Sequence, residues 1–382
     1  MNIQISTNFN QQPSYAFGEK VSFQKQFCRV PDCDKFEMST NPTFTGKKVN
    51  RKEQKKIEET LKNIDGLHDP YSDVIMISSK KYKSFQSKLN HRNNASAAIY
   101  LLNDYTQHMF PSDKDMFEII KQQSKSMEQY YNKSDITFHT ILQELEPKAK
   151  VRLVNDQFDV IDNIREISQN KLPIQYQKEV ESYLTIIEKD IYYDRFRIKP
   201  SIKMLRNLYD EVPNKEVVDE IIKETRNFPN TATNTDAFIV KNANKTHKEI
   251  AELLVSPSLV SIEHIKPSSM NGESKGANYL AASRRMNNLR SSMPFEEFID
   301  RFPEIPQCTQ RYMDDLITKI NRGGLYQVAL TIPDVKQSLL DESHGLIDVD
   351  ISALNPDVLK KIDDFKDLIG NLISHFKKEE TT

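Results

Sequence analysis

The sequence predicts a mainly α-helical protein of the α+β class, in which a small strand-containing unit is embedded between helical regions. Apolar residues recur at helical spacing from residue 51 onward, as in Ile57, Leu61 and Ile64 before Gly66. Residues 260–262 instead have the pattern of a short strand, which Pro267 would end. With 382 residues, the chain is long enough for two or three domains and a sizeable core.

The first half of the chain divides into a leader and a helical domain. Residues 1–50 are rich in Asn, Gln, Ser, Thr, Phe and Pro without helical periodicity, which indicates an extended or disordered leader. Residues 51–227 form the helical domain, with Ser112 and Asn214 as expected N-caps. We expect its later helices over residues 96–110, 113–132, 136–167 with an interruption at Pro147, 173–193, 201–212 and 214–227.

The polar, proline-containing segment 228–234 marks a boundary, after which two further regions follow. Residues 228–300 should contain a helix over 246–254 capped by Thr246, the strand 260–262, and helices over 280–289 and from 293. Residues 301–382 form a helical C-terminal region with a turn at Gly323. Its helices are expected over 311–320 and 355–376.

Charge and cysteine content limit the possible partners. The net charge of −2 means that any nucleic-acid surface must be a local patch, and basic residues outnumber acidic ones between residues 261 and 290. No stretch approaches the length needed to cross a bilayer, so we expect no membrane partner and a cytoplasmic protein. Three cysteines, Cys28, Cys33 and Cys308, fit a reducing compartment, although the first two leave a zinc half-site conceivable.

The residue types needed for phosphodiester hydrolysis gather in residues 261–290. His264 lies 14 residues before Asn278, which lies nine before Asn287. A histidine can activate water near neutral pH, and an asparagine can brace a loop through backbone hydrogen bonds. A carboxylate and an amide oxygen, here those of Glu263 and Asn287, can suffice as protein ligands for a Mg²⁺-type ion beside phosphate.

This segment resembles the HNH (ββα-metal) endonuclease family over residues 240–300. That family's pattern is an acid followed by His-Ile-x-Pro, a glycine-containing loop, Asn-Leu and then Cys-Asn-x-x-Lys. The chain has Glu-His-Ile-Lys-Pro at 263–267, Gly272, Asn-Tyr-Leu at 278–280 and Met-Asn-Asn-Leu-Arg at 286–290. The resemblance therefore implies a ββα module and a metal-dependent endonuclease that hydrolyses nucleic acid, with DNA as the expected substrate.

The resemblance also implies roles for individual residues. His264 would be the general base, Asn278 the loop brace and second catalytic residue, and Glu263 and Asn287 the ligands of a divalent ion, Mg²⁺ or Mn²⁺. Nucleic-acid contacts are expected from the basic residues of the segment, which are Arg290, Arg284, Arg285 and Lys266.

The chain departs from the family pattern in three ways. Ser283 and Met286 stand where many members carry zinc-binding cysteines, so no structural zinc is expected in the module. Glu263 replaces the commoner Asp, and Asn288 competes with Asn287 as the ligand. Two other functions stay open: a catalytically inactive HNH-fold protein that binds nucleic acid, and a helical interaction protein.

Other chemistry-bearing residues are given structural interpretations. His247 and His344 are expected at the surface, and His68 beside Asp69-Pro70 in a turn. The aromatic group Tyr192, Tyr193 and Phe196 is expected to pack in the core rather than to stack bases.

Overall fold

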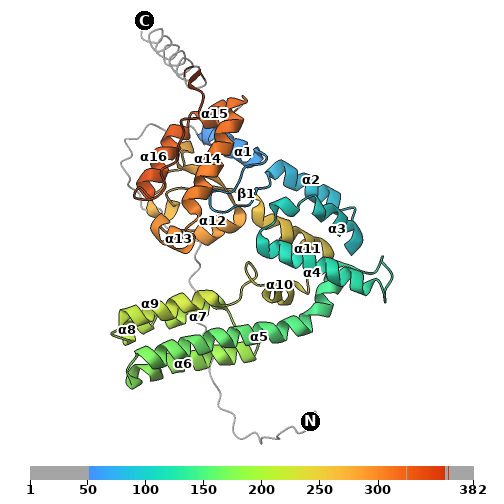
Figure 1. Ribbon diagram of the computed structural model, residues 1–382, viewed down its shortest axis with the longest axis vertical. Helices are drawn as coiled ribbons and strands as arrows, with labels where there is room; N and C mark the ends of the chain where they lie inside the picture. Colours follow the sequence, from blue (N-terminus) through green and yellow to red (C-terminus); the bar gives the residue numbers. More distant parts are fainter. Residues whose placement is uncertain (1–50, 324, 358–359, 361–382) are drawn as a thin grey trace, which may run out of the picture. The chain divides into compact units, whose positions relative to one another are not determined.

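The computed structural model describes residues 51–323, 325–357 and 360, which form a mainly helical structure (Figure 1). The predicted leader, residues 1–50, and most of the predicted final helix, residues 355–376, lie outside this part. Within it there is one sheet, made of two antiparallel strands, β1 (Val260–His264) and β2 (Tyr279–Ser283). The mainly helical fold class is therefore confirmed.

The α-helices come in two groups along the chain. Before the sheet lie α1 (Arg51–Asn63), α2 (Ser79–Leu89), α3 (Ala95–Asn103), α4 (Pro111–Met127), α5 (Phe138–Lys171), α6 (Ile174–Tyr192), α7 (Ile198–Leu205), α8 (Leu208–Glu211), α9 (Lys215–Glu224), α10 (Thr235–Asn242) and α11 (His247–Val255). After it lie α12 (Arg284–Arg290), α13 (Phe295–Arg301), α14 (Ile305–Asn321), α15 (Tyr326–Ala329) and α16 (Ile332–Glu342).

Two of the three predicted N-caps are confirmed. The Asn214 side chain accepts from the Val217 N–H, and Thr246 forms a capping box with Glu249 at the start of α11. Ser112 does not cap α4, because the helix begins one residue earlier, at Pro111, a residue that fits the first helical turn. The Ser112 hydroxyl donates instead to the Ala232 carbonyl.

Several predicted helix limits differ from the structure, and two of these differences have a clear physical cause. Helix α5 is 34 residues long and is not interrupted at Pro147. Its packing against α6, α9 and α10 outweighs the one backbone hydrogen bond that the proline removes. The helix expected over residues 280–289 begins only at Arg284. The preceding residues pair with β1 and become strand β2, and Ser283 then caps α12 by accepting from the Met286 N–H.

Three hydrophobic clusters hold the described residues together, and they do not follow the predicted limits at 227/228 and 300/301. The first joins α1 and residues 64–76 to both strands and to α12–α16. The second joins α2–α4 and the start of α5 to α10 and α11, and the third lies among α5–α9. The ββα unit therefore shares one core with the C-terminal helices and with α1.

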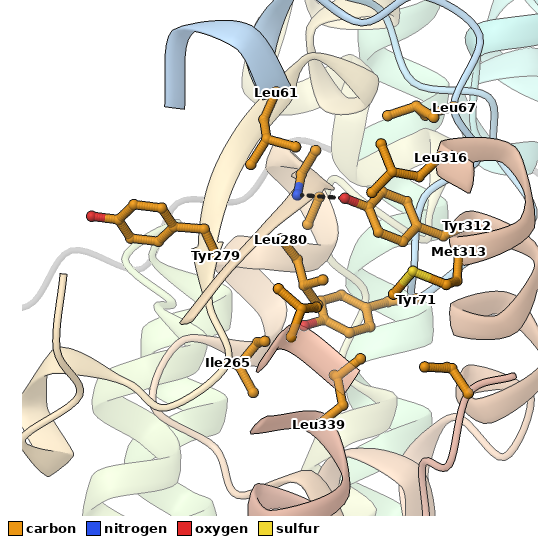
Figure 2. Close-up of a cluster of buried hydrophobic side chains, with 14 of the residues drawn as sticks. Leu61, Leu67, Tyr71, Ile265, Tyr279, Leu280, Tyr312, Met313, Leu316 and Leu339 are labelled. Atoms are coloured by element: carbon orange, nitrogen blue, oxygen red, sulfur yellow. Dashed lines mark hydrogen bonds between the residues drawn. The ribbon is translucent and has the colours of Figure 1, made fainter. Parts of the chain in front are cut away.

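The first cluster surrounds the hairpin closely. Figure 2 shows Leu280 of β2 among Tyr71, Ile265 and Leu339, with Tyr312 of α14 beside them. The Ala281 N–H donates to the Tyr312 hydroxyl at 3.2 Å, so this buried phenol also ties α14 to the strand (Figure 2).

Three side chains outside the hairpin differ from their predicted setting. Tyr192 and Tyr193 are 78% and 61% exposed rather than packed, whereas Phe196 packs on Phe228 with ring centroids 4.9 Å apart. His247 is half-buried rather than at the surface, because its Nδ1 accepts from the Phe138 N–H at the start of α5. His344, which was also expected at the surface, is exposed.

We predict that Leu280→Ala destabilises the fold by about 2–5 kcal/mol, since a buried leucine leaves a cavity when truncated. The matched control is Leu289→Ala on α12, where the side chain is 44% exposed and the change should stay within about 0.5 kcal/mol. Urea unfolding followed by circular dichroism measures both. Equal losses in the two variants would contradict the placement of β2 in the core.

Candidate active site

The strands, the loop between them and the next helix form a β-β-α unit. His264 at the end of β1 pairs with Tyr279 at the start of β2, and Val260 pairs with Ser283. Helix α12 then follows without a linker and packs against both strands. Strand side chains alternate between faces, so Ser261 and Glu263 share one face of the hairpin and His264 lies on the other.

Helix α12 packs on the face that carries Ser261 and Glu263. The Asn287 side-chain amide donates to the Ser261 hydroxyl at 2.9 Å and to the Ile262 carbonyl at 3.0 Å. Arg290, three residues further along α12, contacts Glu263. Asn287 and Arg290 thus fix the helix against β1 from the same face.

The Asn278 side chain closes the loop between the strands. Its oxygen accepts from the Lys266 N–H at 2.7 Å, and its amide donates to the carbonyls of Lys266 and Glu273 at 3.0 and 2.9 Å. All three bonds join backbone groups of the loop to one buried side chain. Such a carboxamide, bonded on both its donor and acceptor sides, sets the path of the loop after His264.

The two glycines of this loop lie where the chain has no space for a side chain. A Cβ at Gly272 would stand 1.9 Å from the Lys266 carbonyl oxygen. A Cβ at Gly276 would stand 2.7 Å from the methyl group of Thr331, the residue that precedes α16. Both positions require glycine because of close approach rather than because of backbone conformation. The loop is therefore packed against its own start and against the C-terminal helices.

Glu263 and Arg290 form a buried ion pair, being 3% and 1% exposed. The Arg290 guanidinium donates to the Glu263 carboxylate, to the His264 carbonyl at 2.8 Å and to the Ile265 carbonyl at 2.5 Å. It also lies 4.0 Å from the centre of the Phe295 ring. Burial raises the pKa of Glu263 to about 7, and the neighbouring Arg290 acts in the opposite direction.

The residues expected to hold a divalent ion do not fit one in this arrangement. The Glu263 carboxylate already contacts a cation, and a divalent ion at the same oxygens would meet the Arg290 guanidinium at short range. Asn287 contributes only a neutral amide. Across the described residues, no group of three or more His, Cys, Asp or Glu side chains is placed to hold a metal ion.

The expected phosphate contacts are also mostly occupied within the protein. Arg290 is buried, which contradicts its predicted contact with nucleic acid. Arg285 donates to Asp113 and lies 4.4 Å from the Phe110 ring centre, and Lys266 pairs with Glu342 at 3.1 Å. Arg284, the first residue of α12, is exposed and is the candidate among the four best placed to meet a phosphate.

His264 lies half-exposed on the face of the hairpin opposite α12. Its ring meets that of Tyr279 edge to face, with centroids 5.1 Å apart. Burial lowers the pKa of His264 from its ordinary value. Arg290 acts in the same direction and Glu58 of α1 in the opposite one. This shift favours the neutral imidazole, which is the form that can accept a proton.

Sequence reasoning missed Asp69, which holds the start of α12 from a distant part of the chain. This buried carboxylate accepts from the Ser283 N–H and hydroxyl, each at 3.0 Å, and from Ser72 at 2.6 Å. Burial raises the pKa of Asp69 to about 6. The only local signal was the turn-forming pair Asp69-Pro70, which says nothing of a partner 214 residues away.

The neighbouring His68 was expected only to take part in a turn. In the structure it also contacts α14. Its backbone N–H donates to the Asp315 carboxylate on α14 at 3.0 Å, and its Nδ1 lies 2.7 Å from the same oxygen. His68 therefore fastens the segment before Asp69 to the C-terminal helices.

Comparison with known proteins adds no further assignment. No protein-family model, curated protein or solved structure matches the chain.

Replacing the loop brace should destabilise the unit. We predict that Asn278→Ala costs about 1–3 kcal/mol of unfolding free energy, because buried backbone groups of Lys266 lose their partner. Asn288→Ala, on the exposed side of α12, is the control and should stay within about 0.5 kcal/mol. Urea unfolding tests the pair, and an Asn278 variant as stable as the control would remove the proposed bracing.

Proposed function

We propose that the β1–loop–β2–α12 unit cleaves phosphodiester bonds in nucleic acid, as an endonuclease acting on DNA with His264 as general base. One observation carries this proposal: a half-exposed histidine ends β1, directly before a loop braced by Asn278 and on the face of the hairpin opposite a helix held by Asn287. The order of these residues matches that of the HNH pattern in the sequence.

In the proposed reaction, His264 removes a proton from a water molecule as its oxygen attacks phosphorus. A new P–O bond forms, the bond from phosphorus to the 3′-oxygen breaks, and the leaving oxygen takes a proton from solvent. His264 then returns its proton to solvent. Asn278 supports this role indirectly, because its hydrogen bonds fix the backbone that follows His264.

Arg284 supports binding away from the cleaved bond. It follows Ser283, which pairs with Val260 at the far end of the hairpin from His264. Four residues of strand span about 13 Å, so we place Arg284 on a different phosphate from the one that His264 would attack. Arg284 would instead hold a neighbouring phosphate of the same nucleic-acid backbone.

The proposed divalent cofactor is Mg²⁺ or Mn²⁺, which would neutralise charge on the phosphate. Because Glu263 is paired with Arg290, no ligand of such an ion is assigned and no step above depends on one.

The buried Glu263–Arg290 pair favours a second candidate function. A unit whose acid is closed off from substrate could bind nucleic acid through Arg284 without hydrolysing it. This candidate differs from the first in a single observable, which is cleavage of bound substrate.

A plasmid-nicking assay separates these functions. With Mg²⁺ or Mn²⁺ present, we predict that His264→Ala lowers the cleavage rate by about 10²–10⁴-fold, since it removes the general base. His344→Ala is the matched control, because that histidine is exposed and remote in sequence from the unit. A chelator arm shows whether a divalent ion is required.

Each outcome of this assay has a distinct meaning. Undiminished cleavage by the His264 variant would exclude the proposed mechanism. Binding of DNA without cleavage by the wild type would select the second candidate, and neither binding nor cleavage would leave a helical interaction protein.

A further inference from the structure

A pocket of about 580 Å³ is lined by residues of α13 and of the segment 202–226, which runs from α7 to the turn after α9. Its charged lining residues are four basic and two acidic ones, namely Arg206, Lys223, Arg226 and Arg301 against Asp219 and Glu297. The chain as a whole has a net charge of −2, so the sign of this pocket is opposite to that of the protein. A pocket with this excess of positive charge suits an anionic group.

Both acids of the pocket already accept from donors of the protein. The Tyr209 hydroxyl donates to Asp219, and Arg301 contacts Glu297, which lies four residues before it on α13. Arg226 also faces the Glu297 carboxylate, but at 3.9 Å, a distance too long for a hydrogen bond. One carboxylate thus stands before two guanidinium groups, and the donors of Arg226 are left for another acceptor.

The other two cations of the pocket have no acidic partner. Across the residues that the structure describes, neither the Arg206 nor the Lys223 side chain forms an ion pair or a hydrogen bond, and both are exposed. The Arg301 Nε is buried and lacks a hydrogen-bond partner within the same part of the chain. Partial burial and the neighbouring Arg301 lower the pKa of Arg226, while Glu297 acts in the opposite direction. Positive charge in the pocket is therefore only partly balanced.

A row of basic side chains leads along α7 to this pocket. From Arg195 to Arg206 the chain has five basic residues and no acidic one. Lys199, Lys203 and Arg206 follow one another at intervals of four and three residues, so they lie on one side of the helix, and all three are exposed. An exposed basic row that ends in a pocket fits the repeated charges of a phosphate backbone better than a single small anion.

Helix α13 connects the pocket to the β-β-α unit. Phe295, its first residue, lies with its ring centre 4.0 Å from the Arg290 guanidinium, and Arg301, its last residue, lines the pocket. Seven residues of helix span about 10 Å. A nucleic acid held in the pocket would therefore be held one short helix away from the unit that carries His264.

We propose that this pocket, together with the basic row on α7, binds phosphate groups of the nucleic-acid backbone. Arg206, Lys223 and Arg226 contact the phosphate oxygens, and Glu297 orients Arg301 while competing with the phosphate for Arg226. This inference rests on the proposed function, because it takes nucleic acid as the substrate. It gives the helices α7–α9 a part in holding the substrate that is separate from the chemistry of His264.

Fluorescence anisotropy with a labelled DNA duplex tests the site, in full-length His264→Ala protein so that cleavage does not affect the readout. Adding Arg206→Gln and Lys223→Gln together should weaken binding at least about tenfold. It should also lower the slope of log Kd against log salt concentration by about 2, because two phosphate contacts are lost. The matched control combines Lys88→Gln and Arg322→Gln, which remove the same charge from exposed positions outside the pocket and should change neither quantity.

A variant of opposite sign adds a second check. Glu297→Gln removes the carboxylate that competes with the phosphate, so it should tighten DNA binding about threefold. Glu296→Gln makes the same charge change on an exposed neighbour that does not line the pocket, and it should leave the affinity unchanged.

The outcomes separate this site from the proposed catalysis. Binding that is lost only in the pocket variant, with a wild type that does not nick plasmid, would support the site and contradict the nuclease. Equal affinities of the pocket and control variants, with unchanged circular dichroism, would overturn the site even if the wild type cleaves. Failure of the unsubstituted pocket to bind the duplex would overturn it as well.

Titration calorimetry with sodium pyrophosphate distinguishes nucleic acid from a free phosphate compound. Saturable binding of pyrophosphate that disappears in the pocket variant, alongside an unchanged affinity for DNA, would assign the pocket to a small phosphorylated ligand. That result would overturn the assignment to the nucleic-acid backbone.

Discussion

The β-β-α unit depends on one buried ion pair, that between Glu263 of β1 and Arg290 of α12. The guanidinium satisfies the carboxylate and two carbonyls at the point where β1 passes into the loop. It thereby joins the last turn of the helix to the strand end that carries His264. An ion pair of this kind costs desolvation, and what it provides is a defined position: moving either partner leaves the other charged and buried.

The two faces of the hairpin consequently do different things. Toward α12, Asn287 and Arg290 hold the helix, and Asp69 anchors its first turn through Ser283. On the opposite face the half-exposed His264 meets the buried Tyr279 ring. The candidate general base thus lies on one side of the hairpin, and the polar contacts that hold α12 lie on the other. The loop between β1 and β2 is held by the hydrogen bonds of Asn278 and by the close approach of Gly272 to the Lys266 carbonyl.

Local rules predicted what depends on neighbouring residues. The helix caps at Asn214 and Thr246, the strand before Pro267 and the mainly helical class all followed from short-range patterns. The start of α12 was misplaced because pairing with β1 decides whether residues 279–283 extend, and that partner lies across a loop. Arg290 was assigned to phosphate because spacing shows which residue follows Asn287 but not which way it faces. Asp69 could not be found from spacing, since its partner Ser283 lies 214 residues away.

A double-mutant cycle on Glu263 and Arg290 tests the central claim most directly. Urea unfolding would compare Glu263→Gln, Arg290→Met and the double variant with the wild type. We predict a loss of about 3–5 kcal/mol for removing Arg290 alone, because an unpaired carboxylate is left buried. We also expect the double variant to lose less stability than the sum of the two single variants, with a coupling energy above about 1 kcal/mol. Additive losses would contradict the claim that this pair holds the unit together.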